Sequence, residues 1–249
     1  HSNRSTQMPF LSLLLSFSSL SMAAPTADEI LAQIDQNMNY DTRTAQLQMT
    51  VTKGRRVKIF EMTSHGRGAD EAAIEFKAPA RDKGTKMLKK GDELWMYLPS
   101  IEQTQRISGH MLRQGMMGSD MSYEDILESS ALKDIYTATV VGEETILERP
   151  VYRLELIAKS NEVAYAKRVS WIDSEFLVPV KEELYATSGM LVKEWTMTDV
   201  IDIEGRKFPT RIVVEDKLQA NSKTEMQFIS VDFKVDVEDE VFSQRWLER

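Results

Sequence analysis

The sequence predicts a mainly β protein of the α+β class, built as a strongly curved antiparallel sheet or incomplete β-barrel of about ten or eleven strands with a helical lid. Apolar and polar residues alternate with a period of two over much of the chain between residues 44 and 235. Turn-forming pairs such as Gly91-Asp92 and Glu204-Gly205 separate these segments. Connections this short require antiparallel neighbours, because parallel strands need long crossovers.

Composition restricts the possible function classes. The 249 residues are 42% hydrophobic and 28% charged, with 7 Pro and 11 Gly, which excludes disordered, collagen-like and polytopic membrane proteins. The net charge of -8 disfavours binding to nucleic acid. Since there is no Cys, disulfides, thiolate zinc sites, iron–sulfur clusters and cysteine nucleophiles are excluded.

Residues 1–23 have the pattern of a secretory signal peptide. Arg4 precedes an apolar run of about 13 residues, and Ser21 and Ala23 supply the small residues that signal peptidase requires. The run is shorter than the roughly 20 residues that span a bilayer as a helix. The alternative interpretation is a buried N-terminal helix. We expect export to the periplasm, a single domain over residues 24–249, and translation from another start, for which Met8 is a candidate.

The domain begins with one helix and one hairpin. Thr26-Ala-Asp-Glu29 has the spacing of a capping box, and the apolar residues that follow share one helical face. The period then changes to two over residues 44–52, and Lys53-Gly54 marks a tight reversal. The return strand, 55–63, changes phase at Ile59-Phe60, where we expect a bulge.

The remaining strands follow the same pattern. No Pro-, Ser- or Gly-rich linker divides the chain, so a single curled sheet is favoured over a sandwich of two sheets. The strands are expected at 72–77, 85–90, 93–98, 103–107, 136–145, 151–158, 164–172, 178–185, 191–199, 209–216 and 223–235.

Residues 108–133 interrupt the strand pattern with a loop and a helix that begins at Ser122, with Asp125 at the reciprocal capping position. Asp120, Glu124, Asp125 and Glu128 form an acidic cluster that could bind a metal or act as paired glycosidase carboxylates. The structural interpretation is favoured, because Asp125 caps the helix and acidic residues are stabilised in a first turn.

Catalytic motifs are absent from the sequence. It contains no GxSxG elbow, HExxH motif, glycine-rich phosphate loop or EF-hand. His65 and His110 are expected to be surface residues. We therefore expect no enzymatic activity, no metal and no cofactor.

Methionine is concentrated in one region. Six of the 14 Met lie within residues 87–121. Met87 and Met96 fall in strands, where they can fill gaps in a core. Met111, Met116, Met117 and Met121 lie in the Gly-interrupted segment, and flexible Met side chains suit a lid over an apolar cavity.

Four segments carry a resemblance to a known family. MLKKGDELWMYLPSIEQTQRIS, GMMGSDMSYEDI, WIDSEFLVPVKEELYATSGMLVKEW and EGRKFPTRI resemble the bacterial outer-membrane lipoprotein-sorting proteins, relatives of the periplasmic lipoprotein carrier LolA. The resemblance implies an incomplete barrel with a helical lid, a role in carrying acylated lipoproteins or lipids, and a lid-locking arginine, for which Arg43 and Arg106 are candidates. It also implies an inner-membrane transporter of the RND type as a partner.

Two functions follow from this resemblance. The first is a periplasmic carrier that moves acyl chains toward the outer membrane, and the second is an accessory or lipid-sensing domain that partners the transporter. A hydrolase on a curved sheet is disfavoured, since no nucleophile and base are evident. Either function needs an apolar cavity, whose expected residues are Leu31, Ile34, Met87, Trp95, Tyr97, Met111, Met116, Met117, Met121, Tyr123, Trp171 and Trp195.

Overall fold

The fold is one antiparallel sheet of thirteen strands. The computed structural model describes residues 23–38, 40–127 and 132–249, so nearly all of the expected signal peptide, 1–23, lies outside the described residues. The strand order is β6-β5-β4-β3-β2-β1-β13-β12-β11-β10-β9-β8-β7, and β6 and β7 are the two open edges. The strands are β1 (Arg43–Lys53), β2 (Arg56–Arg67), β3 (Glu71–Ala78), β4 (Lys86–Lys90), β5 (Glu93–Leu98), β6 (Gln103–Ile107), β7 (Tyr136–Ile146), β8 (Arg149–Ala158), β9 (Lys167–Asp173), β10 (Pro179–Tyr185), β11 (Leu191–Ile203), β12 (Arg206–Asp216) and β13 (Ser222–Phe233).

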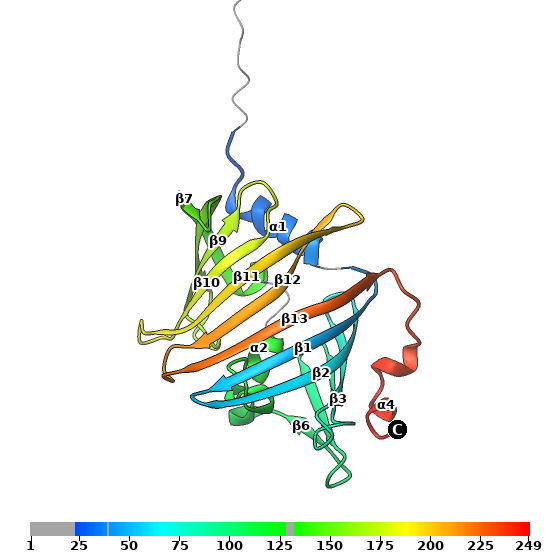
Figure 1. The fold of residues 1–249 in the computed structure, drawn as a ribbon. Coiled ribbons are helices and arrows are strands. Elements are labelled where there is room, and N and C mark those ends of the chain that lie inside the picture. Colours follow the sequence, from blue (N-terminus) through cyan, green and yellow to red (C-terminus); the bar gives the residue numbers. More distant parts are fainter. Residues whose placement is uncertain (1–22, 39, 128–131) are drawn as a thin grey trace, which may run out of the picture.

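The curved, open antiparallel sheet that the sequence predicts is confirmed (Figure 1). It has more strands than the expected ten or eleven, because every alternating segment found in the sequence forms a strand of its own. Pairing of β1 with β13 joins the two halves of the chain into one sheet, which makes β1 a central strand.

Helices are short, apart from the first. They are α1 (Ala27–Met38), η1 (Gly109–Arg113), η2 (Met116–Gly118), α2 (Tyr123–Leu127), α3 (Leu132–Ile135), η3 (Asp239–Phe242) and α4 (Gln244–Leu247). The predicted capping box of α1 is confirmed: the amide of Thr26 donates to Glu29 at 2.8 Å, and the amide of Glu29 donates to the Thr26 hydroxyl at 3.2 Å. No helix among the described residues has both the length and the apolar character needed to cross a membrane.

The two faces of the sheet have separate cores. We call the face that contacts α1 and α2 the inner face and the opposite face, which contacts α4, the outer face (Figure 1). Strand β5 shows the division, because Leu94 and Met96 pack in the inner core whereas Trp95 and Tyr97 pack on the outer face near Phe242. The described residues between β6 and β7, 108–127 and 132–135, are called the insert and pack on the inner face.

The expected bulge at Ile59-Phe60 is wrong. Pairing of β1 with β2 is continuous there, and the irregularity lies between Glu61 and Met62 on the side of β3. The apparent change of phase has another cause. Val57 and Ile59 are exposed apolar residues on the outer face, whereas Phe60 and Met62 belong to the inner core. Apolar side chains on both faces of one strand imitate a bulge in the sequence.

Candidate functional site

A partly enclosed pocket of about 270 Å³ lies between the inner face of the sheet and the insert. Its wall comes from the end of α1, from strands β1 to β4 and from β11 and β13, while the insert covers it. The lining residues are Met38, Tyr40, Arg43, Leu47, Ser64, Gly66, Gly68, Ala69, Glu71, Ala72, Ile74, Lys89, Met121, Asp125, Ile126, Trp195, Met226 and Phe228.

One end of the pocket is cationic. Arg43 pairs with Gly66, Gly66 with Ala72, and Ala72 with Lys89, so these four residues form one row across β1 to β4. The guanidinium of Arg43 lies over Gly66, where an added Cβ would be 3.5 Å from Nη2. Two small residues thus separate the two cations of the row and leave space between them.

The neighbouring rows are apolar. Ala45, Ser64, Ile74 and Met87 occupy the next inner row, and Leu47 lies in the row after it, paired with Phe228 of β13. Because inner-face residues recur every second position, the pocket changes from charged to apolar within two such steps along β1.

Burial alters the acid–base properties of two residues in the pocket. Burial raises the pKa of Tyr40, and the nearby Arg43, whose guanidinium lies 5.0 Å from the ring centre, acts in the opposite direction. Burial lowers the pKa of Lys89, against the effect of the nearby Asp70 and Asp92. The Lys89 ammonium donates to the carbonyl of Ala69 at 3.1 Å.

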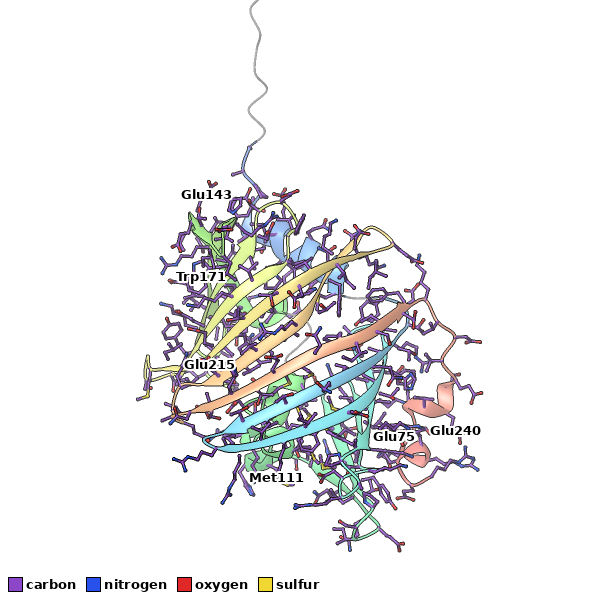
Figure 2. The ribbon with its side chains drawn as sticks, viewed as in Figure 1. Glu75, Met111, Glu143, Trp171, Glu215 and Glu240 are labelled. Atoms are coloured by element: carbon purple, nitrogen blue, oxygen red, sulfur yellow. The ribbon has the colours of Figure 1, made fainter. Side chains whose placement is uncertain are left out.

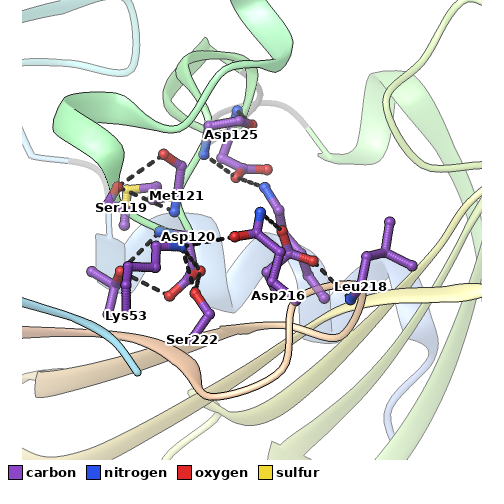
Figure 3. A network of polar contacts seen from close by, with 12 residues as sticks. Lys53, Ser119, Asp120, Met121, Asp125, Asp216, Leu218 and Ser222 are labelled. Atoms are coloured by element: carbon purple, nitrogen blue, oxygen red, sulfur yellow. Dashed lines mark hydrogen bonds and ion pairs between the residues drawn. The ribbon is translucent and has the colours of Figure 1, made fainter. Parts of the chain in front are cut away.

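Asp120 attaches the first part of the insert to the sheet (Figure 3). Its carboxylate accepts hydrogen bonds from Lys53 at 2.6 Å, from Ser222 and from Thr224 at 3.1 Å. Its amide donates to the Thr224 hydroxyl at 2.8 Å. Asp120 is 3% exposed, so these contacts are shielded from water.

Asp125 attaches the second part of the insert. The expected capping box is confirmed, since the Ser122 amide donates to Asp125 at 2.7 Å and the Asp125 amide donates to the Ser122 hydroxyl at 3.2 Å. The same carboxylate also pairs with Lys193 of β11 and accepts a hydrogen bond of 2.6 Å from the Tyr165 hydroxyl. The two buried aspartates therefore hold the insert against both halves of the sheet.

The expected cavity residues lie in different places. Met121 and Trp195 line the pocket. Met87, Met116 and Tyr123 are buried in the inner core beside it, and Met111 and Met117 pack against that core while partly exposed. The structure thus brings the insert methionines to the covered side of the sheet.

Five of the expected cavity residues lie away from the pocket. Leu31 and Ile34 fix α1 against β7, β8 and β9. Trp95 and Tyr97 pack on the outer face against the C-terminal segment. Trp171, also on the outer face, donates a hydrogen bond of 2.8 Å to Glu144, and lies in the half of the molecule opposite Met111 (Figure 2).

Several residues that line the pocket are not among the cavity residues that the sequence predicts. Phe228 and Met226 carried a signal in the alternation of residues 223–235. Lys89 lies two residues after Met87 in MLKKGDELW and therefore shares its face of the strand. Arg43 is predicted only as a candidate for the lid-locking arginine. The other candidate, Arg106, is on the edge strand β6, where it is exposed and pairs with Glu93 at 2.9 Å.

The acidic cluster has a structural explanation in the described residues. Asp120 and Asp125 are engaged as above, and Glu128 lies outside the described residues. Within residues 23–38, 40–127 and 132–249, no group of three or more His, Asp or Glu side chains is placed to hold a metal ion.

Comparisons with known proteins agree with this architecture. A family model described as that of an uncharacterized protein matches residues 68–249. No curated protein matches the chain. A DUF1329 family protein from Desulfovibrio piger is similar in structure, with a TM-score of 0.82, 26% identity and coverage of 88% of this chain and 96% of that chain.

Two further solved structures are similar. A LolA superfamily protein from Nitrosomonas europaea has a TM-score of 0.74 and 25% identity, and the match covers 90% of this chain and 100% of that chain. A candidate outer membrane lipoprotein-sorting protein domain from Vibrio parahaemolyticus has a TM-score of 0.78 and 22% identity, with coverage of 89% and 97%. The resemblance to lipoprotein-sorting proteins that the sequence motifs predict is confirmed.

Proposed function

This chain belongs to the family whose model matches residues 68–249 and has the LolA-superfamily fold, and from this premise we propose that it is a periplasmic carrier that binds acyl chains of lipoproteins or lipids and moves them toward the outer membrane. The single observation that supports the proposal most is the pocket of about 270 Å³ between the inner face and the insert. Part of its wall consists of apolar side chains such as Leu47, Ile74 and Phe228.

The physical need for such a carrier is large. Each methylene exposed to water is unfavourable by about 0.8 kcal/mol, so a 16-carbon chain opposes transfer through water by about 12 kcal/mol. The pocket volume lies just below the roughly 300–1,000 Å³ typical of ligand sites. It therefore suits one acyl chain better than several.

The insert acts as the lid in this proposal. It covers the pocket with Met121 and Ile126, and its attachments at Asp120 and Asp125 are polar contacts that can exchange for contacts with water. Flexible Met side chains adapt to a mobile chain without holding it rigidly. Binding and release then depend on how tightly these two aspartates hold the insert. The proposed role requires no catalytic group, metal or cofactor.

Mass spectrometry of the protein purified from the periplasm tests the proposal. We expect a stoichiometric acylated lipid or lipoprotein, and the purified protein should transfer it to acceptor vesicles. Ala72→Phe places a bulky side chain in the pocket and should abolish loading. Thr63→Phe, on the outer face of the neighbouring strand β2, is the matched control and should load normally.

Other results would contradict the carrier. Equal loading of both variants would show that the chain is bound elsewhere. An empty protein that forms a stable complex with an inner-membrane transporter would favour the accessory or lipid-sensing role.

A further inference from the structure

Two buried hydrogen-bond donors in the pocket have no acceptor. Within the part of the chain that the structure describes, the Nε of Arg43 and the indole Nε1 of Trp195 are inaccessible to water and make no hydrogen bond. Both residues line the same pocket. Leaving a buried donor without a hydrogen bond is unfavourable. An oxygen-bearing ligand in the pocket would remove this penalty.

Among the described residues, no carboxylate forms an ion pair with Arg43. Its guanidinium lies over Gly66 and near two aromatic rings, 5.0 Å from the ring centre of Tyr40 and 5.9 Å from that of Phe228. Lys89, in the same row across the sheet, adds a second positive charge to this end of the pocket.

The acidic residues of the pocket are already paired. Glu71 binds Arg67 at 2.6 Å and Lys90 at 3.6 Å. Asp125 binds Lys193 and Tyr165. Neither carboxylate is thus available to neutralise Arg43.

From this arrangement we infer that the pocket selects an amphiphile with an anionic head, a carboxylate or a phosphate, held between Arg43 and Lys89, with its acyl chain directed toward Leu47, Ile74 and Phe228. The inference rests on the proposed function and specifies its cargo. A neutral lipid with the same chain would fill the apolar rows but leave the charge of Arg43 without a counter-charge. Arginine suits both oxyanions, because its planar group donates two parallel hydrogen bonds.

Displacement of a neutral fluorescent probe, N-phenyl-1-naphthylamine, by three ligands with the same 18-carbon chain tests the inference. Oleate and oleyl phosphate should displace the probe at concentrations at least tenfold lower than oleyl alcohol. The stronger of the two anions identifies the head, since oleate represents a free fatty acid and oleyl phosphate represents a lipid phosphate.

Variants at the cationic row assign the preference to the pocket. Arg43→Gln should reduce the tenfold preference to less than threefold, because displacement by the two anions weakens more than displacement by oleyl alcohol, and Arg43→Lys should retain most of the preference. Lys89→Gln provides an independent test if Arg43→Gln does not fold, as judged by circular dichroism, and should also weaken the preference. Arg106→Gln, on the exposed edge strand, is the control and should behave as the native protein.

The outcomes separate this inference from the proposed function. Equal displacement by the anions and the alcohol, or equal loss of all three ligands in Arg43→Gln, would overturn the anionic-head assignment and leave the acyl carrier intact. Failure of all three ligands to displace the probe from the native protein would overturn both.

Discussion

The hydroxyl of Tyr165 donates a hydrogen bond of 2.6 Å to the carboxylate of Asp125, across 40 residues of sequence. This bond joins the insert to the loop before β9, in the half of the sheet formed by β7 to β13. Lys193 of β11, in the same half, pairs with the other oxygen of the same carboxylate. Because Lys53 of β1 pairs with Asp120, the position of the lid depends on groups from both halves of the sheet.

Replacement of Asp125 by Asn tests this attachment. The change keeps the shape of the side chain and removes its charge, which leaves the largely but not fully buried Lys193 without its counter-charge. Breaking a buried pair destabilises proteins by about 3–5 kcal/mol, and we expect a loss toward the lower end of that range. The free energy of unfolding in urea measures the effect. Asp236→Asn, at an exposed position, is the control and should change stability by less than about 0.5 kcal/mol. Equal effects of the two changes would argue against the attachment.

Gly115 is expected to be required for the turn at η2 within the lid. Its φ of -67° suits any residue, but an added Cβ would lie 2.0 Å from the carbonyl oxygen of Ser119. Gly115→Ala should therefore destabilise by about 1–3 kcal/mol, as overpacking does, and should increase cleavage of the insert in limited proteolysis. Gly142→Ala is the matched change, because its Cβ would meet no atom within 4 Å. Similar cleavage of both variants would contradict this explanation.

Met116 and Met117 are expected to respond differently to truncation. Met116 is 1% exposed in the inner core, so Met116→Ala should destabilise by about 2–5 kcal/mol. Met117 is only partly buried, and Met117→Ala should lower stability by less than about 1 kcal/mol. Thermal and urea unfolding of both variants provide the comparison. A large loss for Met117→Ala would show that it belongs to the core as fully as its neighbour.

Stability should depend on pH through Asp173. Burial alone raises the pKa of Asp173, but hydrogen bonds from Arg149 and from the amides of Phe176 and Glu175 outweigh it, so the pKa in the folded state lies below the usual 3.8. The unfolded chain then binds the proton more readily. The stabilisation is present above about pH 4 and is lost as the pH falls through the folded-state pKa.

Asp173→Asn should therefore reduce the free energy of unfolding more at pH 7 than at pH 3. Urea unfolding at the two pH values measures this difference. Arg149, which contacts Asp173 at 2.6 and 3.1 Å, supplies a second test, because Arg149→Gln removes one of the three groups that lower this pKa and should reduce the same pH dependence. If Asp173→Asn lowered the free energy of unfolding by the same amount at pH 7 and at pH 3, Asp173 would be excluded as the source of the pH dependence.

The sequence predicts the architecture well, because its signals are local. Strand β6 occupies the expected residues 103–107, and β4 begins one residue after the expected start. Both capping boxes form as their spacing predicts, since each involves residues three apart. Local hydrogen bonds and the two-residue repeat of a strand need no knowledge of distant segments.

The site is less predictable, because its contacts join distant segments. Lys53 lies 67 residues from Asp120, and Lys193 lies 68 residues from Asp125. Spacing near Ser122 indicates a cap but not these partners. Apolar composition likewise indicates that Trp95 and Trp195 are buried in part, but not that they lie on opposite faces of the sheet.

Alternation, turn residues and capping spacing thus determined that this chain forms an open antiparallel sheet with a helical insert. Tertiary structure decided which face of each strand became the inside of the curve. A strand such as β5, with apolar side chains on both faces, packs equally well in either orientation until the insert and the C-terminal segment each cover one face. The row of Arg43, Gly66, Ala72 and Lys89 exists only because the registers of four strands bring these residues into line.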